Sequence, residues 1–194
     1  MTYYTDPELS KRQMNIIQGT ILGGSSIISP NHGRNSYLSM RHKDLSWLTY
    51  KASELSPLAA KKALLTETTY RWHSMCCPFF NEQKCLFYRN QQRHLTLKTL
   101  EQCNLMDIAF AVWYGDAGNY TSGNVILNTH IWGEENSLVI IEYLQLLDFQ
   151  AELFTSRGNF RIRLDAQSSC QFIEMIWPVL PYSFCQKYPL RSSR

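Results

Sequence analysis

The sequence predicts an α+β fold built from two similar halves, and three observations carry this prediction. Two apolar runs without proline, 15–26 and 108–119, are each long enough for about three helical turns. In both halves the same order of helices and strands follows the run, which indicates an internal repeat of about ninety residues. Both runs contain small residues four positions apart: Gly19 and Gly23 in the first, Ala111 and Gly115 in the second.

These small residues predict how the two runs pack. Glycine inside a helix is less favourable than alanine by about 1 kcal/mol, so a helix that contains two of them must gain something in return. Small residues on one helix face allow another helix backbone to approach closely. We therefore expect the two helices to pack together at the centre of the molecule, with one αββαββα repeat on either side.

In the first half, a strand begins at Ser26, a turn follows at 31–34, and a second strand covers 35–42. Alternation in that strand places Leu38 and Met40 on one face, and Tyr37, Ser39 and Arg41 on the other. Asp44 is a candidate cap for the next helix, whose apolar positions are Leu45, Leu48, Ala52 and Leu55. A link at 56–62, a strand at 66–74 and a helix beginning at Pro78 complete the repeat.

The second half repeats this plan. A turn at 119–124 leads into a strand at 124–131, followed by a helix over 134–147. The apolar stripe expected on that helix is Leu138, Ile141, Leu144 and Leu147. Two strands, 150–156 and 159–165, form a hairpin through Arg157-Gly158, and a last helix covers 166–177. The predicted domain organisation is one repeat at 14–94, a linker at 95–103 and a second repeat at 104–188.

Composition limits the class of protein. The chain has 194 residues, a net charge of +3, 44% hydrophobic and 18% charged residues, which is typical of a globular protein. It has no apolar run of about 20 residues to cross a membrane and no apolar core of a signal peptide at its start, so we expect an intracellular protein. Its six cysteines form no C-x-x-C pair and no paired spacing with histidine, which argues against a zinc site.

The strand at 159–165 is the most informative for function. Phe160, Ile162 and Leu164 alternate with a polar set that contains Asn159, Arg161 and Arg163. Such a polar face is common on solvated antiparallel sheets. It is also what a β-surface needs to read the major groove, because arginine pairs with guanine and asparagine with adenine. Alternation alone leaves both interpretations open.

The two apolar runs also carry a family resemblance. IIQGTILGGS and AFAVWYGDAGN resemble the two signature helices of single-chain LAGLIDADG homing endonucleases, a family of DNA-cleaving enzymes. The resemblance implies that the helices form the interface between the halves and that antiparallel sheets bind DNA. It also implies that an acid at the end of each helix binds divalent metal. In this sequence those two acid positions are Gly24 and Ala117, so both carboxylates are missing.

Further site residues follow from the resemblance and from the polar strand faces. Arg93 and Lys187 match the basic residues that follow the last helix of each half in the family, and each is otherwise an ordinary surface charge. Asp116 is a possible substitute metal ligand if the helix end is rearranged; otherwise it is an ordinary polar residue near a helix end. The candidate DNA-binding residues are Arg34, Tyr37, Arg41, Arg71, His73, Asn124, Asn128, His130, Arg157, Asn159, Arg161 and Arg163.

We therefore expect a monomer that binds a long, asymmetric site on double-stranded DNA without cutting it. Mg²⁺, Mn²⁺ or Ca²⁺ would serve an active parent. Deliberate inactivation and natural loss of cleavage both fit the two missing acids, and restoring both is expected to return cleavage. The alternatives are an RNA-binding intron maturase, a DNA-binding regulator and a protein-interaction scaffold. The expected compartment is a mitochondrial or chloroplast matrix, or a bacterial or phage cytoplasm.

Overall fold

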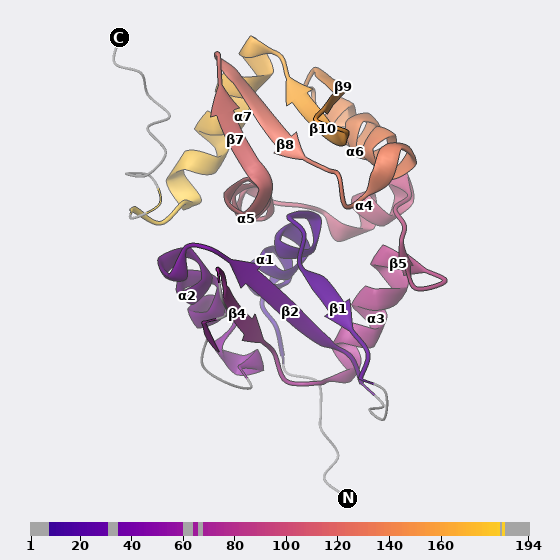
Figure 1. Ribbon diagram of the computed structural model, residues 1–194, viewed down its shortest axis with the longest axis vertical. Coiled ribbons are helices and arrows are strands. Elements are labelled where there is room, and N and C mark those ends of the chain that lie inside the picture. Colours follow the sequence, from indigo (N-terminus) through magenta and orange to yellow (C-terminus); the bar gives the residue numbers. More distant parts are fainter. Residues whose placement is uncertain (1–7, 31–34, 60–63, 66–67, 183, 185–194) are drawn as a thin grey trace, which may run out of the picture.

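The computed structural model describes residues 8–30, 35–59, 64–65, 68–182 and 184. Two layers of similar structure meet at a pair of central helices, α1 and α5 (Figure 1). The first repeat consists of α1 (Lys11–Leu22), β1 (Ser26–Ile28), β2 (Tyr37–His42), α2 (Leu45–Glu54), a 3-10 turn (Ser56–Leu58), β3 (Leu64–Leu65), β4 (Tyr70–His73) and α3 (Pro78–Phe87).

The second repeat has the same topology. It consists of α5 (Asp107–Ala117), β7 (Gly118–Thr121), β8 (Asn124–Asn128), α6 (Gly133–Leu146), β9 (Ala151–Ser156), β10 (Asn159–Leu164), α7 (Ala166–Ile176) and a 3-10 turn (Trp177–Val179). Its sheet has the strand order β7-β8-β10-β9, which matches β1-β2-β4-β3 in the first repeat, and all pairings are antiparallel. The predicted α+β fold of two αββαββα repeats is confirmed.

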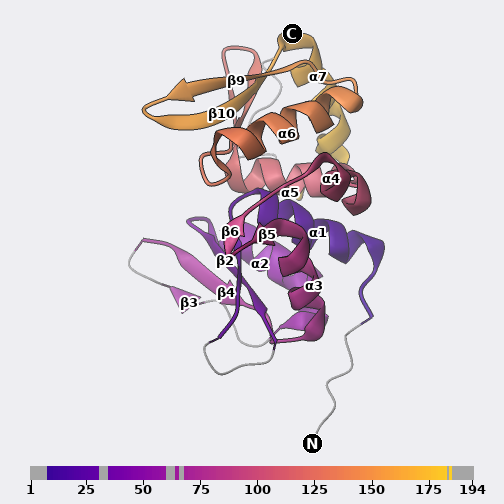
Figure 2. The ribbon, with the colours of Figure 1, turned by 90° about the vertical axis from the view of Figure 1, so that its right-hand side faces the viewer.

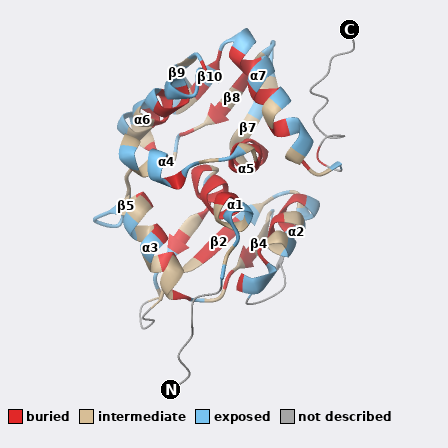
Figure 3. Ribbon diagram, turned by 180° about the vertical axis from the view of Figure 1, so that it is seen from behind, coloured by how far each residue is buried: buried red, intermediate tan, exposed pale blue. Residues whose placement is uncertain are grey.

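The central helices are buried because their sequences are apolar on most sides. Ser10 and Gln13 form a capping box that starts α1, and the helix is buried from Asn15 to Leu22. A methyl group at Gly19 would overlap the backbone carbonyl of Ala109 on α5, so this glycine permits the close approach of the two helices. Figure 3 shows both helices as the buried centre of the molecule.

The predicted helix contact is confirmed for two of the glycines and corrected for a third. A Cβ atom at Gly23 would overlap the Cβ of Asp116 on α5, so Gly23 lies at the contact as expected. Gly115 instead faces the indole ring of Trp47 on α2. The small residue there admits a large side chain from the first repeat rather than the backbone of α1. Ala111 is fully buried.

Alternation along the strands separates a buried face from an outer face. Leu38, Met40 and Trp72 are buried in the first sheet, as Leu127 and Ile162 are in the second. The sheets lie on the same side of the molecule: β3, β4, β9 and β10 project to the left in Figure 2, whereas α1, α3, α4 and α7 lie to the right. Polar residues on alternate strand positions therefore share one outer surface.

Two predicted helix faces are confirmed only in part: Leu48 and Leu55 of the first set and Ile141 and Leu144 of the second are buried. On α2, Leu45 is 43% exposed, and Trp47, Leu48 and Lys51 are the buried residues. On α6, Leu138 and Leu147 are exposed, because the buried face is shifted toward Ile140 and Tyr143. That face consists of Ser137, Ile140, Ile141, Tyr143 and Leu144.

Two segments predicted as connections contain regular structure. Residues 118–121 form strand β7, because the hairpin turn lies at Ser122-Gly123, where both residues have positive φ. The predicted linker contains α4 (Leu97–Cys103), which Thr96 caps. A small hairpin precedes it, β5 (Tyr88–Arg89) and β6 (Gln92–Arg93). The predicted turn at 31–34 lies outside the described residues. Within the described part of the chain, no helix is long and apolar enough to span a membrane.

Candidate nucleic-acid interface

The outer face of the first sheet carries two arginines directly opposite each other. Arg41 on β2 pairs with Arg71 on β4 in the antiparallel register. Like charges at such positions destabilise a sheet unless an anion lies between or above them. Among the described residues neither arginine has a carboxylate partner, and the Nε of Arg71 is buried without a hydrogen-bond partner. This pair is therefore suited to an external anion.

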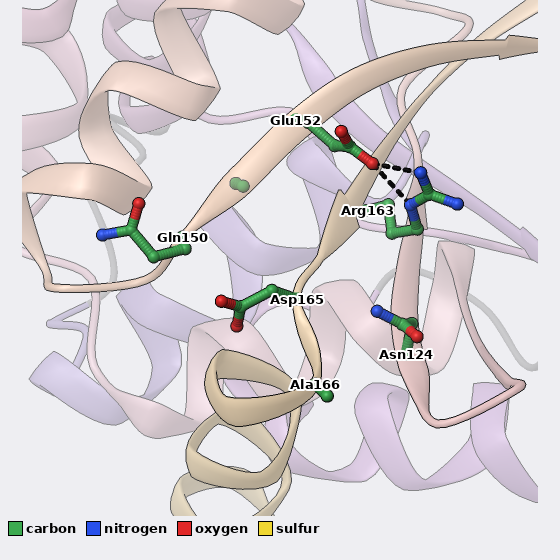
Figure 4. Close-up of a pocket in the computed structure, with 7 residues that line it drawn as sticks. Asn124, Gln150, Glu152, Arg163, Asp165 and Ala166 are labelled. Carbon is green, nitrogen blue, oxygen red and sulfur yellow. Dashed lines mark hydrogen bonds and ion pairs between the residues drawn. The ribbon is translucent and has the colours of Figure 1, made fainter.

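The two arginines of β10 differ from each other. Arg163 donates to the carboxylate of its cross-strand neighbour Glu152, from Nε at 2.6 Å and also from Nη2 (Figure 4). Its guanidinium carbon also lies 5.4 Å from the ring centre of Phe154. Arg161 has no such partner in the described part of the chain, and its Nε is buried without a hydrogen bond. Arg161 is thus the cation of this strand that is left for a ligand.

The asparagines expected to face DNA are tied to the protein backbone. The amide of Asn128 donates to the carbonyl oxygen of Ala117 at the end of α5, and Asn124 donates to the carbonyl of Leu164, both at 2.7 Å. Each amide nitrogen therefore already supports the sheet, although each side chain keeps its oxygen as an acceptor.

The other predicted DNA-binding residues are spread over the first sheet, the β9–β10 hairpin and the connection between β8 and α6. Tyr37 and His73 form an edge-to-face ring pair on the first sheet, with ring centroids 5.3 Å apart. Arg157 and Asn159 are exposed at the tip of the β9–β10 hairpin. His130 is exposed in the connection between β8 and α6, because the strand ends three residues earlier than predicted. Arg34 and Lys187 lie outside the described residues.

Arg93 binds the C-terminal end of α1. Its Nη2 donates to the carbonyl of Ser25 at 2.7 Å and of Gly24 at 3.2 Å, and its Nη1 donates to the carbonyl of Ile21 at 3.3 Å. The guanidinium lies over the ring of Trp132, at 4.9 Å from the ring centre, and burial lowers the pKa of Arg93. Because carbonyls at a helix C-terminus carry partial negative charge, a cation there is stabilising.

Asp116, near the end of α5, is enclosed by two residues of the first repeat. Both its carboxylate oxygens lie 2.6 Å from Nζ of Lys51, and Nε1 of Trp47 donates to it at 2.7 Å. The Lys51 side chain is 0% exposed and that of Asp116 is 5% exposed. Burial lowers the pKa of Lys51, and the charge of Asp116 opposes this shift. This geometry argues against Asp116 as a substitute metal ligand.

The two helix ends have related surroundings. Trp132 of the second repeat donates from Nε1 to the carbonyl of Leu22 at the end of α1, at 3.0 Å. Trp47 of the first repeat donates from Nε1 to the side-chain carboxylate of Asp116, near the end of α5, at 2.7 Å. Each end therefore has one indole N–H from the opposite repeat and one cation. Sequence reasoning missed Trp47, Lys51 and Trp132, because no local pattern links residues so far apart.

The donor set at the helix ends does not fit a divalent metal of the kind that the family resemblance implies. Mg²⁺ and Ca²⁺ require oxygen ligands, mainly carboxylates. Gly24 and Ala117 supply no side-chain oxygen, and the Asp116 carboxylate is occupied by Lys51. No group of three His, Cys, Asp or Glu residues that could hold a metal occurs in the described ranges.

The backbone at Gly24 adds a second difference. Its φ is +115°, a conformation that residues with side chains rarely adopt. Only Ile131 lies near a Cβ atom built there, at 3.8 Å, so the restriction comes from the backbone rather than from crowding. An aspartate at this position would be strained, which argues against the expectation that restoring two acids is sufficient for cleavage.

A groove of about 720 Å³ lies beside the end of α1, between the two repeats. Arg41, Tyr88 and Arg93 line it from the first repeat, and His130 lines it from the second. No acidic residue is among the described residues that line it. This groove runs from Arg41 on the first sheet to Gly24 at the end of α1.

Comparison with known proteins agrees with this architecture. A sequence model described as the LAGLIDADG DNA endonuclease family matches residues 14–172. A search of curated proteins finds no match. Among solved structures, the homing endonuclease I-WcaI bound to its DNA recognition sequence matches with a TM-score of 0.84 and 15% identity, over 96% of this chain and 94% of that one.

Two further structures show how widely the fold is shared. I-DmoI in complex with DNA and Mn matches with a TM-score of 0.57 and 10% identity, over 86% of this chain and 96% of that one. The N-terminal LAGLIDADG domain of DUF199/WhiA matches with a TM-score of 0.54 and 11% identity, over 94% and 90%. At these identities the structural matches establish the fold alone. The match to the family model covers most of the sequence, and the chain therefore belongs to the LAGLIDADG DNA endonuclease family.

Proposed function

We propose that this protein binds a specific site on double-stranded DNA with the outer faces of its two sheets. The observation that carries the proposal is the set of arginines without carboxylate partners in the described part of the chain, Arg41, Arg71 and Arg161. They lie on sheets that share one side of the molecule, and arginine is the side chain best suited to guanine and to phosphate. The DNA-bound state of I-WcaI supports the choice of ligand.

The same proposal includes the absence of cleavage. Metal-dependent hydrolysis of DNA requires carboxylates that hold the metal against the attacking water and the leaving oxygen. Gly24 and Ala117 supply none, and Asp116 is paired with Lys51. One chain contains both repeats, so we further propose that it acts as a monomer on a site without twofold symmetry.

A binding selection on randomised duplex DNA tests the proposal. The selected duplex is then titrated with the parent and with a triple variant, Arg41→Ala, Arg71→Ala and Arg161→Ala. Each contact to a base contributes about 1–3 kcal/mol, so the triple variant should bind at least a hundredfold more weakly. A matched variant removes the same charge from the helical side of the molecule: Lys11→Ala, Arg12→Ala and Lys98→Ala.

The matched variant should bind the selected duplex within a few fold of the parent, because its charges lie away from the sheets. Equal losses in both variants would mean that only net charge matters and would contradict a specific sheet interface. Failure to select any duplex, together with tight binding of structured intron RNA, would favour the maturase alternative. Incubation with Mg²⁺ should leave the bound duplex intact; cutting would contradict the proposed lack of catalysis.

A further inference from the structure

Positive charge is unevenly distributed along the chain. Residues 99–156 contain no lysine or arginine, although they hold half of the 16 acidic residues. Two of these acids, Asp116 and Glu152, form ion pairs with Lys51 and Arg163, which lie outside the segment. None of the ion pairs among the described residues includes the other six, which are Glu101, Asp107, Glu134, Glu135, Glu142 and Asp148. This part of a chain with a net charge of +3 therefore carries uncompensated negative charge.

Helix α6 combines three of these acids with exposed leucines. Leu138 is 51% exposed and Leu146 is 58% exposed. Residues four positions apart lie on the same face of a helix, so Glu142 lies between the two leucines. Glu135 lies about one turn before Leu138 on that face, and both glutamates are exposed. We call these four residues the α6 stripe: Glu135, Leu138, Glu142 and Leu146.

The α6 stripe faces away from the sheet that is proposed to bind DNA. The other face of α6, which includes Ile140 and Leu144, is buried, and the helix packs against β9 and β10. Figure 2 shows α6 on the side turned toward the viewer, whereas β9 and β10 project to the left. Figure 3 shows exposed residues along α4 and α6. A molecule bound to the stripe would therefore leave the outer faces of the sheets free.

Helix α4 extends this negative surface. Burial raises the pKa of Tyr143 on α6, and the charge of Glu101 on α4 raises it further, which indicates that this acid lies close to α6. From Lys98 on α4 to Arg157 at the tip of the β9–β10 hairpin, the sequence supplies no further lysine or arginine to balance these acids.

We propose that the α6 stripe docks a basic amphipathic helix of a partner protein. Leu138 and Leu146 contact the apolar residues of that helix, and Glu135 and Glu142 pair with lysines or arginines that flank them. A single exposed leucine needs no explanation, but two leucines in one stripe with acids beside them match this mode of recognition. The proposal goes beyond DNA binding and does not depend on it.

Charge favours this partner over two others. The phosphates of a nucleic acid carry the same sign of charge as the stripe, so the stripe repels them. A second copy that docked through the same stripe would form a twofold contact, which brings the glutamates of both copies together. A partner with lysines and arginines beside its apolar residues meets neither obstacle.

A peptide selection tests the chemistry of the partner without assuming its sequence. Random peptides of about 20 residues, long enough to form a helix, are selected on the full-length protein. Peptides that also bind the variant Leu138→Ser with Leu146→Ser are removed in each round. The remaining peptides should have apolar residues at helical spacing, flanked by lysine or arginine. Enrichment of any other pattern would overturn the proposal, as would a selection in which no peptide distinguishes the parent from the variant.

The acids are tested with a selected peptide and two variants of equal net charge. Glu135→Lys with Glu142→Lys should weaken binding by about tenfold or more, because attraction is replaced by repulsion. Glu82→Lys with Glu174→Lys makes the same change at exposed positions of α3 and α7, and should bind within about twofold of the parent. Equal weakening of both variants would mean that net charge alone attracts the peptide, and would overturn the proposal.

Leu45→Ser is the control for the loss of an exposed leucine, since Leu45 is 43% exposed on α2. It should bind the peptide as the parent does, and a loss equal to that of Leu138→Ser with Leu146→Ser would contradict a specific stripe. Urea unfolding of each variant checks that it remains folded, which is expected for changes at exposed positions.

Two further measurements address the other occupants. Sedimentation of the parent should show no self-association through the stripe; a dimer that Leu138→Ser with Leu146→Ser abolishes would mean that a second copy covers it. RNA binding that the same variant abolishes would also overturn the proposal. This variant should bind the selected DNA duplex as tightly as the parent. If no duplex binds, the proposed DNA-binding function fails, and the peptide result stands by itself.

Discussion

Removal of the Asp116 carboxylate should strongly destabilise the protein. The carboxylate contacts Nζ of Lys51 and Nε1 of Trp47, and both charged side chains are almost fully enclosed. Breaking a buried ion pair by deleting one partner costs about 3–5 kcal/mol, because the other charge is left without compensation. Since burial lowers the pKa of Lys51, the lysine can release its proton, which limits the loss to about this range. We expect Asp116→Ala to lose about 4 kcal/mol.

Urea unfolding measures this loss. With an unfolding slope of about 2 kcal/mol per molar urea, the midpoint of Asp116→Ala should fall by about 2 M. The double variant Lys51→Met with Asp116→Leu should recover most of it, because no unpaired charge remains. Glu152→Ala removes a carboxylate from the exposed pair with Arg163 and should change stability by about 1 kcal/mol or less.

The reasoning would be refuted by an Asp116→Ala variant whose stability lies within about 1 kcal/mol of the parent. It would also be refuted if the double variant were no more stable than Asp116→Ala. The second result would mean that Asp116 acts through a partner other than Lys51. A metal-ligand role predicts a different outcome, in which replacing Asp116 changes Mg²⁺-dependent cutting and leaves the urea midpoint unchanged.

Three further outcomes are expected. Gly19→Leu should lower the free energy of unfolding by about 1–3 kcal/mol or more in urea, because its side chain meets the carbonyl of Ala109. Gly24→Asp with Ala117→Asp should remain unable to cut the bound duplex in Mg²⁺, and Gly24→Ala should cost about 1–3 kcal/mol because of its φ of +115°. Burial lowers the pKa of His42 in the folded state below 6.5. As the pH falls, His42 therefore binds a proton in the unfolded state at a higher pH than in the folded state, which favours unfolding. The stability of the parent should therefore decrease below about pH 6.5, and that of His42→Gln should decrease less when both are melted between pH 7 and pH 5.

Much of the fold could be predicted, because apolar residues recur with the period of a strand or a helix and because the second half repeats the order of elements in the first. Period-two alternation separates buried Met40 from exposed Arg41, and the repeated order of elements indicates the shared topology. The packing face of α6 could be predicted only in part, because Ile141 and Leu144 are buried as expected whereas Leu138 and Leu147 are exposed. Apolar residues occur around much of that helix, including the exposed Leu138 and Leu146, so the sequence does not distinguish which of several faces is buried. Contacts with the neighbouring helix and strands determine which face of α6 is buried.

The site could be predicted in part. The motif places Gly24 and Ala117 at the ends of the central helices, as the structure does, and their role in a site stays a prediction. The spacing selects Arg93, whose guanidinium binds backbone carbonyls at the end of α1. The enclosure of Asp116 could not be predicted, because Lys51 is 65 residues away along the chain. No local sequence pattern marks this lysine as buried or as a partner of Asp116. Lys51 stabilises the fold through its contact with Asp116, which lies in the other repeat.

The unequal ends of α1 and α5 have an evolutionary consequence. In a homodimer, a substitution at a helix end is present in both subunits, so the two ends change together. In this chain the repeats are encoded separately, so Arg93 at one end and the Lys51–Asp116 pair at the other could be acquired one at a time. After duplication within one gene, a mutation can therefore change one helix end and leave the other unchanged.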